Sequence, residues 1–334
     1  MNKKNNIVAL FTAPQKIELV KQSMPIAQAN YVLVEYLYCS ICGGDYSVYC
    51  GHRKTYPISL GHEFVGRVIA VGEKVQDIIP GQYVVSDFNF RCNECIYCFS
   101  NQSHLCIKND AGLFSNRGFA TYASIHSSYL MSIEPPDYLP RACLIEPLSC
   151  VIHACHIADV KEGMKVLICG GGGIGMLFCF LLQRVFNNIE VTLAEINSQK
   201  MNLIQKYFHI KPYYCQNEYN YDLVIDCSNS ISGLKFALDN TYRGKQICIM
   251  SHLYGLETSF VYEQACKKEL RCHFPLRNGQ HNNLLEAAQY INLFWTYEDD
   301  EMLSIYDDIS LAFKEKSFNP FCKQIVKCTA LCMP

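Results

Sequence analysis

The chain has 334 residues, half of them hydrophobic, which is enough for two domains with full cores. Its formal net charge of −2, with 18% charged residues, gives no electrostatic basis for binding nucleic acid or an anionic membrane surface. The N-terminal segment lacks the apolar run of a signal peptide, so we expect a cytoplasmic protein whose 20 cysteines stay reduced. In a reduced protein, clustered cysteines indicate a metal site and scattered ones act as small core residues.

The first part of the chain has the pattern of a β-rich domain. Alternating apolar and polar residues at 7–38, 64–90 and 118–133 predict strands separated by turns. A polar, cysteine-studded lobe at 91–109 interrupts them.

From about residue 141 the pattern changes to helices alternating with strands, which predicts a doubly wound parallel sheet. The final part has two helical segments and a late strand, KQIVKC. We therefore predict an α/β protein with a β-rich domain at 1–148, a parallel-sheet domain at 149–280 and a return segment at 281–334. The longest uncharged stretch, 166–183, carries five glycines and is interpreted as a strand, a turn and a helix rather than a membrane span.

A dinucleotide site is predicted inside that stretch. The pattern G-x-G-x-x-G follows strand-like VLIC and opens a helix, and Glu195 lies 20 residues beyond Gly175. The glycines would let the backbone approach a pyrophosphate at the helix N-terminus. Glu195 would bind the ribose hydroxyls and repel a 2′-phosphate, which favours NAD over NADP; the alternative is a glycine turn without a ligand. The predicted contacts are Gly170, Gly172, Gly173, Ile174, Gly175 and Glu195.

A structural zinc site is predicted in the lobe. Its cysteines follow the spacing C-x2-C-x2-C-x7-C, and four thiolates on one loop can close a tetrahedral shell around Zn2+ that leaves no position for substrate. The alternatives are an iron–sulfur cluster or a loop without metal. A nucleic-acid-binding zinc module is disfavoured because the loop carries one arginine before its first cysteine and no lysine until Lys108. The predicted ligands are Cys92, Cys95, Cys98 and Cys106.

Taken together, these motifs resemble the zinc-containing medium-chain alcohol and polyol dehydrogenases over essentially the whole chain. Three further motifs carry the resemblance: CGGD at 42–45, GHE at 61–63 and IEPLS at 145–149. The resemblance implies a GroES-like β-rich catalytic domain, a Rossmann domain and a C-terminal return to the first domain. It places the active site in the cleft between the domains, and it implies a homodimer or homotetramer.

The resemblance also implies a second, catalytic zinc. Cys42 and His62 are its expected ligands, and Glu63 and Glu146 are both candidates, between which the sequence leaves the choice open. Thiolate, imidazole and carboxylate are the donors of open zinc sites with about three protein ligands. Asp45 is expected to accept the other ring N–H of His62 and orient it. Such a zinc acts as a Lewis acid while hydride passes between substrate carbon and nicotinamide.

Two positions depart from the family pattern. Where the family usually has serine or threonine, and often histidine, for a proton relay, this chain has Gly44 and Ser47. Either zinc-bound water and a glutamate (Glu63 or Glu146) carry the proton, or the natural substrate needs a different arrangement, or the enzyme is impaired or repurposed. A glycine would also make room for a bulkier, more hydrated substrate such as a polyol.

Charge near the predicted cleft suggests a second substrate class. Arg53 and Arg277 would clamp a phosphate or carboxylate, or else they are solvated surface residues. The segments LYCSIC and RNG also resemble the ribulose-5-phosphate reductases of the same superfamily. The leading hypothesis is a zinc- and NAD-dependent polyol dehydrogenase. The alternatives are an NADPH-dependent ketose-phosphate reductase, a biosynthetic enzyme acting on an amino-cyclitol or similar alcohol, and a non-catalytic scaffold.

Overall fold

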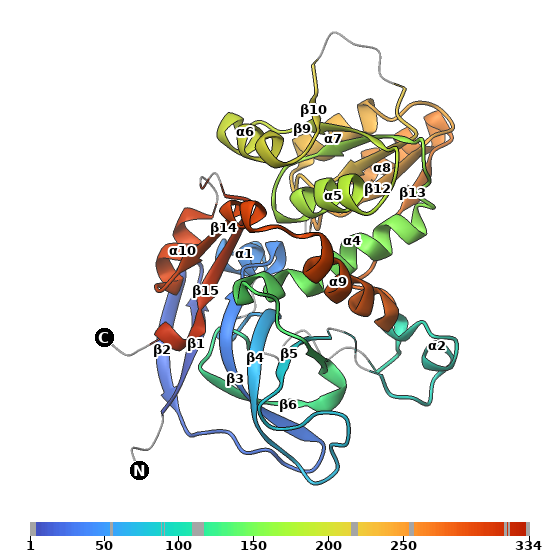
Figure 1. Ribbon diagram of the computed structural model, residues 1–334. Helices are drawn as coiled ribbons and strands as arrows, with labels where there is room; N and C mark the ends of the chain where they lie inside the picture. Colours follow the sequence, from blue (N-terminus) through green and yellow to red (C-terminus); the bar gives the residue numbers. More distant parts are fainter. Residues whose placement is uncertain are drawn as a thin grey trace.

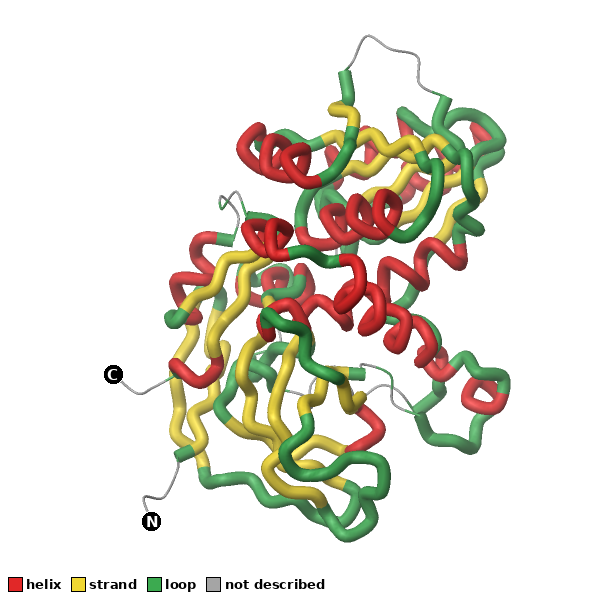
Figure 2. Tube along the Cα trace, viewed as in Figure 1, coloured by secondary structure: helices red, strands yellow, loops and turns green. Residues whose placement is uncertain are grey.

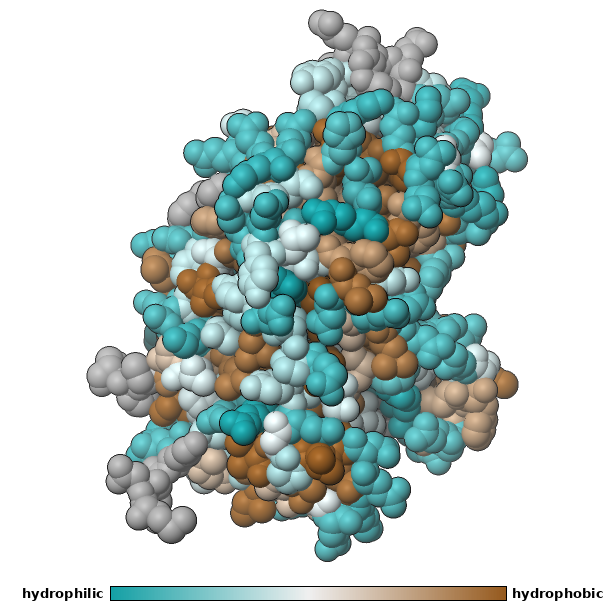
Figure 3. Space-filling model, viewed as in Figure 1, coloured by the Kyte–Doolittle hydropathy of each residue, from teal (hydrophilic) through white to brown (hydrophobic). Residues whose placement is uncertain are grey.

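The computed structural model describes residues 5–53, 56–87, 89, 91–108, 117–214, 220–253, 257–316, 319 and 321–331. It contains two large sheets in separate halves of the molecule, and two long helices cross between the halves (Figure 1). On the face shown in Figure 3, hydrophilic residues predominate and apolar ones lie in several separate groups. No helix within the described ranges is both long and apolar enough to cross a membrane.

The first half is a β-rich domain with short helices at its edges. Its strands are β1 (Asn6–Ala13), β2 (Lys16–Gln22), β3 (Tyr31–Ser40), β4 (Glu63–Val71), β5 (Tyr83–Ser86), β6 (Tyr122–His126), β7 (Leu130–Ile133), β14 (Leu303–Tyr306) and β15 (Lys323–Lys327). Its helices are α1 (Gly43–Tyr49), α2 (Ile96–Phe99), α10 (Ile309–Glu315), η1 (Ser103–Leu105), η2 (Ser127–Tyr129) and η5 (Cys328–Ala330). The sheet order is β14-β15-β3-β4-β5-β7, with β6 paired to β3 and β1–β2 forming a separate hairpin.

Side-chain alternation explains this sheet. In β3, Val32, Val34 and Tyr36 are fully buried, and the residues between them are less so. The C-terminal strands complete the sheet, because β15 pairs antiparallel with β3 and β14 pairs parallel with β15. Segments 285 to 289 residues apart in sequence thus lie side by side (blue and red in Figure 1).

The second half is a six-stranded, wholly parallel sheet in the order β10-β9-β8-β11-β12-β13. Its strands are β8 (Lys165–Cys169), β9 (Glu190–Ala194), β10 (Lys211–Pro212), β11 (Leu223–Asp226), β12 (Gln246–Ile249) and β13 (Arg271–His273). Its helices are α5 (Gly173–Arg184), α6 (Ser198–Tyr207), α7 (Ile231–Asp239) and α8 (Ser259–Lys268). Figure 2 shows these helices distributed around the yellow strands.

Burial on both sheet faces explains why VLIC is continuously apolar. Val166 and Ile168 of β8 belong to one buried cluster, and Leu167 and Cys169 to another on the opposite face. A parallel strand covered on both sides has no solvent-facing positions, so its sequence does not alternate.

One of the buried hydrophobic clusters spans both halves. The joining elements are η3 (Leu139–Leu144), α4 (Ile145–Ile157), α9 (His281–Phe294) and η4 (Tyr297–Met302). The buried cluster around α4 includes Val65 and Val85 of the first sheet as well as the helices of the second. A domain boundary at 148/149 would therefore fall inside α4, a helix that packs on both halves.

The predicted fold class, β-rich plus doubly wound α/β, is confirmed. Among the elements that the sequence interpretation missed are α8, β13 and β14. The two strands are short, with three and four residues, and α8 has no buried residue, so none of the three carries a strong hydrophobic period.

Candidate active site and metal centres

Three predicted metal-ligating residues come together between β3 and β4. Cys42 is the N-cap of α1, directly after β3, and Glu63 begins β4. The antiparallel register pairs Ser40 with Glu63, which brings the two strand ends together. As a result the Cys42 sulfur, a ring nitrogen of His62 and a carboxylate oxygen of Glu63 all lie within 4.8 Å of one another. These donor types and this spacing fit a Zn2+ ion.

Asp45 lies behind the His62 ring. Its Oδ1 is 3.7 Å from His62 Nδ1, and its Oδ2 accepts the Cys42 N–H at 3.1 Å. Burial lowers the pKa of His62, but the charges of Asp45 and Cys42 outweigh burial and raise that pKa well above its ordinary value. The arrangement leaves Nε2 as the ring nitrogen not facing Asp45. An orienting role for Asp45 remains a prediction.

Glu63 has two strong partners inside the protein. Lys323 Nζ lies 2.6 Å from its Oε2, and the Ser40 hydroxyl donates to the same oxygen. Both ionic side chains are almost fully buried. Burial opposes ionisation of Glu63, but the Lys323 ammonium outweighs it, so the pKa of Glu63 falls below its ordinary value.

Glu146 approaches the same site from the first turn of α4. It is buried but stands outside the group of three whose donors lie within 4.8 Å. Burial raises its pKa to about 7, and the opposite charge of His62 reduces the rise. The choice between Glu63 and Glu146 as a metal ligand therefore remains a prediction.

Gly44 and Ser47 lie on α1 beside this cluster. The Gly44 N–H donates to Cys42 Sγ at 3.4 Å, so Gly44 contributes its backbone to the site. A Cβ placed on Gly44 would meet only Cys42 Sγ, at 3.9 Å. Ser47 is buried. The site therefore lacks the relay side chain at position 44 although it has room for one.

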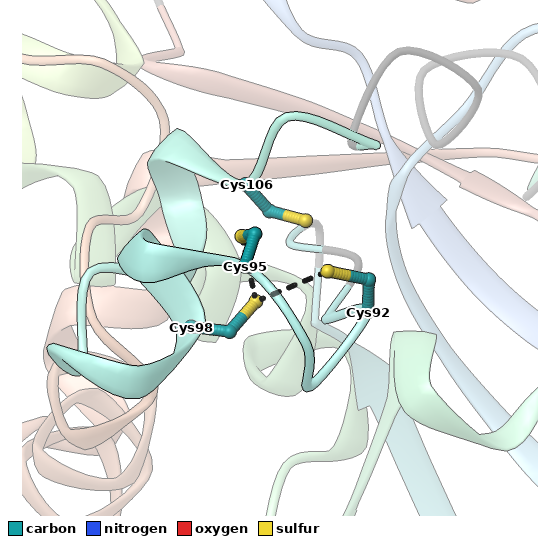
Figure 4. A group of neighbouring side chains, drawn as sticks. All are labelled: Cys92, Cys95, Cys98 and Cys106. Atoms are coloured by element: carbon teal, nitrogen blue, oxygen red, sulfur yellow. Dashed lines mark hydrogen bonds between the residues drawn. The ribbon is translucent and has the colours of Figure 1, made fainter.

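The four lobe cysteines converge on one point (Figure 4). The Cys98 sulfur is 3.8 Å from that of Cys92 and 3.6 Å from that of Cys95. A tetrahedron with Zn–S bonds of about 2.3 Å has edges of about 3.8 Å, which both of these separations match, and all four sulfurs lie within 4.8 Å of one another. The backbone N–H of Cys98 lowers the pKa of Cys95 to about 6, and burial raises that of Cys98 to about 12.

A buried polar network anchors the base of the lobe. Asp87 is fully buried and pairs with Arg91 and, at 2.8 Å, with His281 Nδ1 at the start of α9. Asn89 donates to Asn278 Oδ1 at 2.5 Å. The lobe is thereby tied to the chain that enters α9.

The two arginines predicted to clamp an anion have different neighbours. Arg277 donates from NH1 to the backbone oxygen of His104 in the lobe, at 3.5 Å. Arg53 is close enough to His252, after β12, that its charge adds to burial in lowering the pKa of that histidine. A substrate contact for either arginine remains a prediction.

The glycine-rich turn between β8 and α5 has the geometry that the dinucleotide fingerprint requires. A Cβ on Gly175 would lie 1.9 Å from Gly170 O, and Gly170 has a φ of +100°. Gly172, the N-cap of α5, has nothing within 4 Å of an added Cβ and no side-chain cap. The N-terminus of the 12-residue helix therefore has no side-chain cap and has open space at Gly172, as a pyrophosphate site requires. Ile174 packs against the core.

Glu195 follows β9 and closes the same turn. Its Oε2 accepts the Gly171 N–H at 2.6 Å, and its Oε1 accepts the Asn197 N–H at 2.8 Å. Each oxygen keeps a lone pair for a ribose hydroxyl. The glycine turn and Glu195 therefore have the features that a nicotinamide dinucleotide requires.

Lys323 was missed by the sequence interpretation, although it touches both predicted sites. Besides pairing with Glu63, its Cδ lies 2.9 Å from an ideal Cβ on Gly173, at the start of α5. The metal-ligand cluster and the dinucleotide turn are thus joined through one buried side chain. Nothing local to KQIVKC distinguishes this lysine from a surface residue.

Comparison with known proteins agrees with this architecture. Residues 28–135 match the family model for the alcohol dehydrogenase GroES-like domain. The chain is 28% identical to D-arabinitol dehydrogenase 1 of Uromyces fabae over 59% of its length, and 34% identical to D-arabitol-phosphate dehydrogenase of Enterococcus avium over 57%. These alignments span 56% of each relative, little more than half its length. The structure of galactitol-1-phosphate dehydrogenase from Escherichia coli superposes with a TM-score of 0.82 at 20% identity, covering 96% of this chain and 99% of that one.

The fold, the domain match and these relatives define the class of protein. The GroES-like domain match and the similarity to sorbitol and arabitol-phosphate dehydrogenases support the zinc-containing medium-chain alcohol dehydrogenase-like family for this chain.

Proposed function

We propose that this protein is a zinc-dependent oxidoreductase that transfers hydride between NAD(H) and a secondary alcohol carbon of a polyol or sugar alcohol. The observation that carries the proposal is the position of Lys323, whose head pairs with Glu63 and whose stem packs on the dinucleotide turn at Gly173. A substrate between the two sites would meet the metal-ligand cluster and the nicotinamide end of a bound cofactor together.

Zinc held by Cys42 and His62, with Glu63 or Glu146, would supply Lewis-acid polarisation of the substrate oxygen, and the nicotinamide would accept or return the hydride. The chain's own residues orient the substrate and exclude water. Asp45 orients the His62 ring. The buried carboxylates of Glu63 and Glu146 accept hydrogen bonds from the substrate hydroxyls. With glycine at position 44, proton movement falls to one of these carboxylates.

NAD is the proposed cofactor because Glu195 stands beside the turn, where its charge would repel a 2′-phosphate. The lobe cysteines are proposed to hold a second, structural zinc. A homodimer or homotetramer also remains a prediction.

A phosphorylated polyol or ketose, reduced with NADPH, is the second candidate. Two of the similar proteins are named for arabitol phosphate and galactitol 1-phosphate. Arg53 and Arg277 are the residues that would hold a phosphate in this case. A scaffold that retains the fold without activity is the third candidate.

Turnover and metal content test these proposals together. Purified, zinc-replete protein would be assayed with NAD(H) and NADP(H) against sorbitol, xylitol, ribitol, threonine and ribulose 5-phosphate. Turnover of a free polyol with NAD+, accompanied by two zinc ions per chain, is the expected result. Turnover of the phosphorylated ketose alone would favour the second candidate, and inactivity with one zinc would favour the scaffold.

A matched pair of cysteine variants adds a control. Cys42→Ser should abolish turnover and remove one zinc. Cys266→Ser, which changes an exposed cysteine on α8, should leave turnover and metal content unchanged.

A further inference from the structure

Glu146 has fewer hydrogen-bond donors than the other glutamate of the site. Glu63 receives two strong donors, the Ser40 hydroxyl and the Lys323 ammonium. The hydrogen bond found to the Glu146 carboxylate, among the residues that the structure describes, comes from the Cys150 thiol, with Sγ 3.6 Å from Oε1. Only 4% of Glu146 is exposed, so solvent does not replace the missing donors.

The geometry of α4 fixes this contact. Glu146 and Cys150 are four residues apart on one helix, so their side chains lie on the same face. The Ser149 hydroxyl also bonds the Glu146 backbone oxygen, at 2.6 Å, which secures the first turn. Most of α4 is buried against both halves of the molecule, so the carboxylate and the thiol cannot separate by moving the backbone alone.

A thiol is a suitable hydrogen-bond donor for a carboxylate that also has to bind a metal ion or a substrate hydroxyl. An S–H group is a weak donor, so it can hold a carboxylate oxygen without competing strongly with a metal ion or a substrate hydroxyl. The Cys150 thiol lies 3.6 Å from Glu146 Oε1, within hydrogen-bond distance for sulfur, and is the donor of this contact.

We propose that Cys150 is a positioning residue for Glu146. Its thiol holds Oε1, which would leave Oε2 available to a metal ion or a substrate oxygen. The proposal rests on the proposed function for its effect on turnover, but its effect on the metal site does not depend on turnover.

Three variants separate the thiol's hydrogen bond from its volume. Cys150→Ser keeps a donor, Cys150→Val fills the space without one, and Cys150→Ala removes both. Outer-sphere partners of metal ligands typically affect affinity or activity by about 10–100-fold. We therefore expect the valine and alanine variants to lose at least about tenfold in kcat with KM nearly unchanged, and the serine variant to stay within about threefold of wild type.

Two readouts test the proposal without substrate. The first is the rate at which a chelator removes the catalytic zinc, which should rise about tenfold in the valine and alanine variants and return in the serine variant. The second is the absorption spectrum with cobalt at the catalytic site and zinc kept in the lobe, verified as one of each metal per chain. The cobalt d–d bands should shift with valine and return with serine, while the thiolate-to-cobalt charge-transfer intensity from Cys42 stays constant.

Three outcomes would overturn the proposal. Metal loss and cobalt spectra that are the same in all variants would mean that Cys150 only fills space. A drop in charge-transfer intensity in the serine variant would mean that Cys150 is itself a ligand. Failure of serine to restore what valine loses would mean that the hydrogen bond is not the cause. If the valine variant does not fold, judged by its urea midpoint, the alanine–serine pair gives the same test.

Discussion

Replacing Lys323 by methionine is the sharpest test of how the two sites are joined. Lys323 pairs with Glu63 at 2.6 Å, and the exposed fractions of the two side chains are 4% and 2%. Methionine keeps most of the stem that packs on Gly173 but removes the ammonium. The variant would leave the Glu63 carboxylate buried, with the hydrogen bond from the Ser40 hydroxyl still in place.

The cost follows from the burial of the pair. Removing one member of a buried ion pair typically destabilises a protein by about 3–5 kcal/mol, because the other charge stays desolvated. We expect Lys323→Met to lower the free energy of unfolding of the metal-free protein by about this amount. The matched control is Lys327→Met on the same strand, where Asp307 lies 3.9 Å away and both side chains are exposed, so the cost should be at most about 1 kcal/mol.

Urea denaturation in the presence of a chelator is the assay, with Glu63→Gln added to complete a double-mutant cycle. Neutralising Glu63 removes the stranded charge, so the double variant should be more stable than Lys323→Met alone. A cost for Lys323→Met as small as that for Lys327→Met would refute the reasoning. So would a double variant whose cost is the sum of the two single costs.

Four further predictions concern separate parts of the site. Gly44→Ser should fold with unchanged metal content, because the added Cβ meets only the Cys42 sulfur, at 3.9 Å. Its kcat should change at least about threefold if the new hydroxyl enters a proton relay. Identical kinetics would argue against that role. Glu195→Ala should weaken NAD+ binding by about tenfold, because a hydrogen bond to a charged group is worth about 1.5–3 kcal/mol. NADP+ binding should weaken less. Both affinities would be measured by fluorescence titration, and equal losses would contradict the proposed preference for NAD. Cys106→Ser should lose one zinc per chain with catalytic-site metal retained, and two zinc ions in the variant would place the structural metal elsewhere. Burial raises the pKa of Asp87, but the hydrogen bond from His281 and the other partners of Asp87 outweigh burial and lower that pKa. Ionised Asp87 therefore stabilises the fold above the unfolded pKa of about 3.9, and this stabilisation is lost as pH falls through the folded pKa. Asp87→Asn should make the free energy of unfolding less dependent on pH in acid, and an unchanged pH dependence would exclude this carboxylate as a cause.

Locally encoded features could be predicted from the sequence. The four lobe cysteines lie within 15 residues of one another, so their spacing alone limits them to one loop and one metal. The glycine turn is equally local, because positive φ at Gly170 and the lack of space at Gly175 are demands that a short pattern records. The continuous apolar run of β8 likewise reflects burial on both faces of a parallel sheet.

Contacts between distant segments required the tertiary structure. Arg141 donates to Asp300 from two nitrogens, at 3.2 and 2.8 Å, across 159 residues, and no local pattern distinguishes either residue from a surface charge. The same is true of Lys323, which reaches Glu63 only because β15 returns to pair with β3.

By itself, the sequence determined the two-part architecture, the four-cysteine lobe and the dinucleotide turn, because each depends on hydrophobic period or on residues close together in the chain. Only the tertiary structure decided which partners hold each carboxylate: Lys323 and Ser40 for Glu63, and Cys150 for Glu146. The physical reason is that an ion pair or hydrogen bond depends on distances of a few ångströms, and for Glu63 and Lys323 that distance is set by strand register across most of the chain.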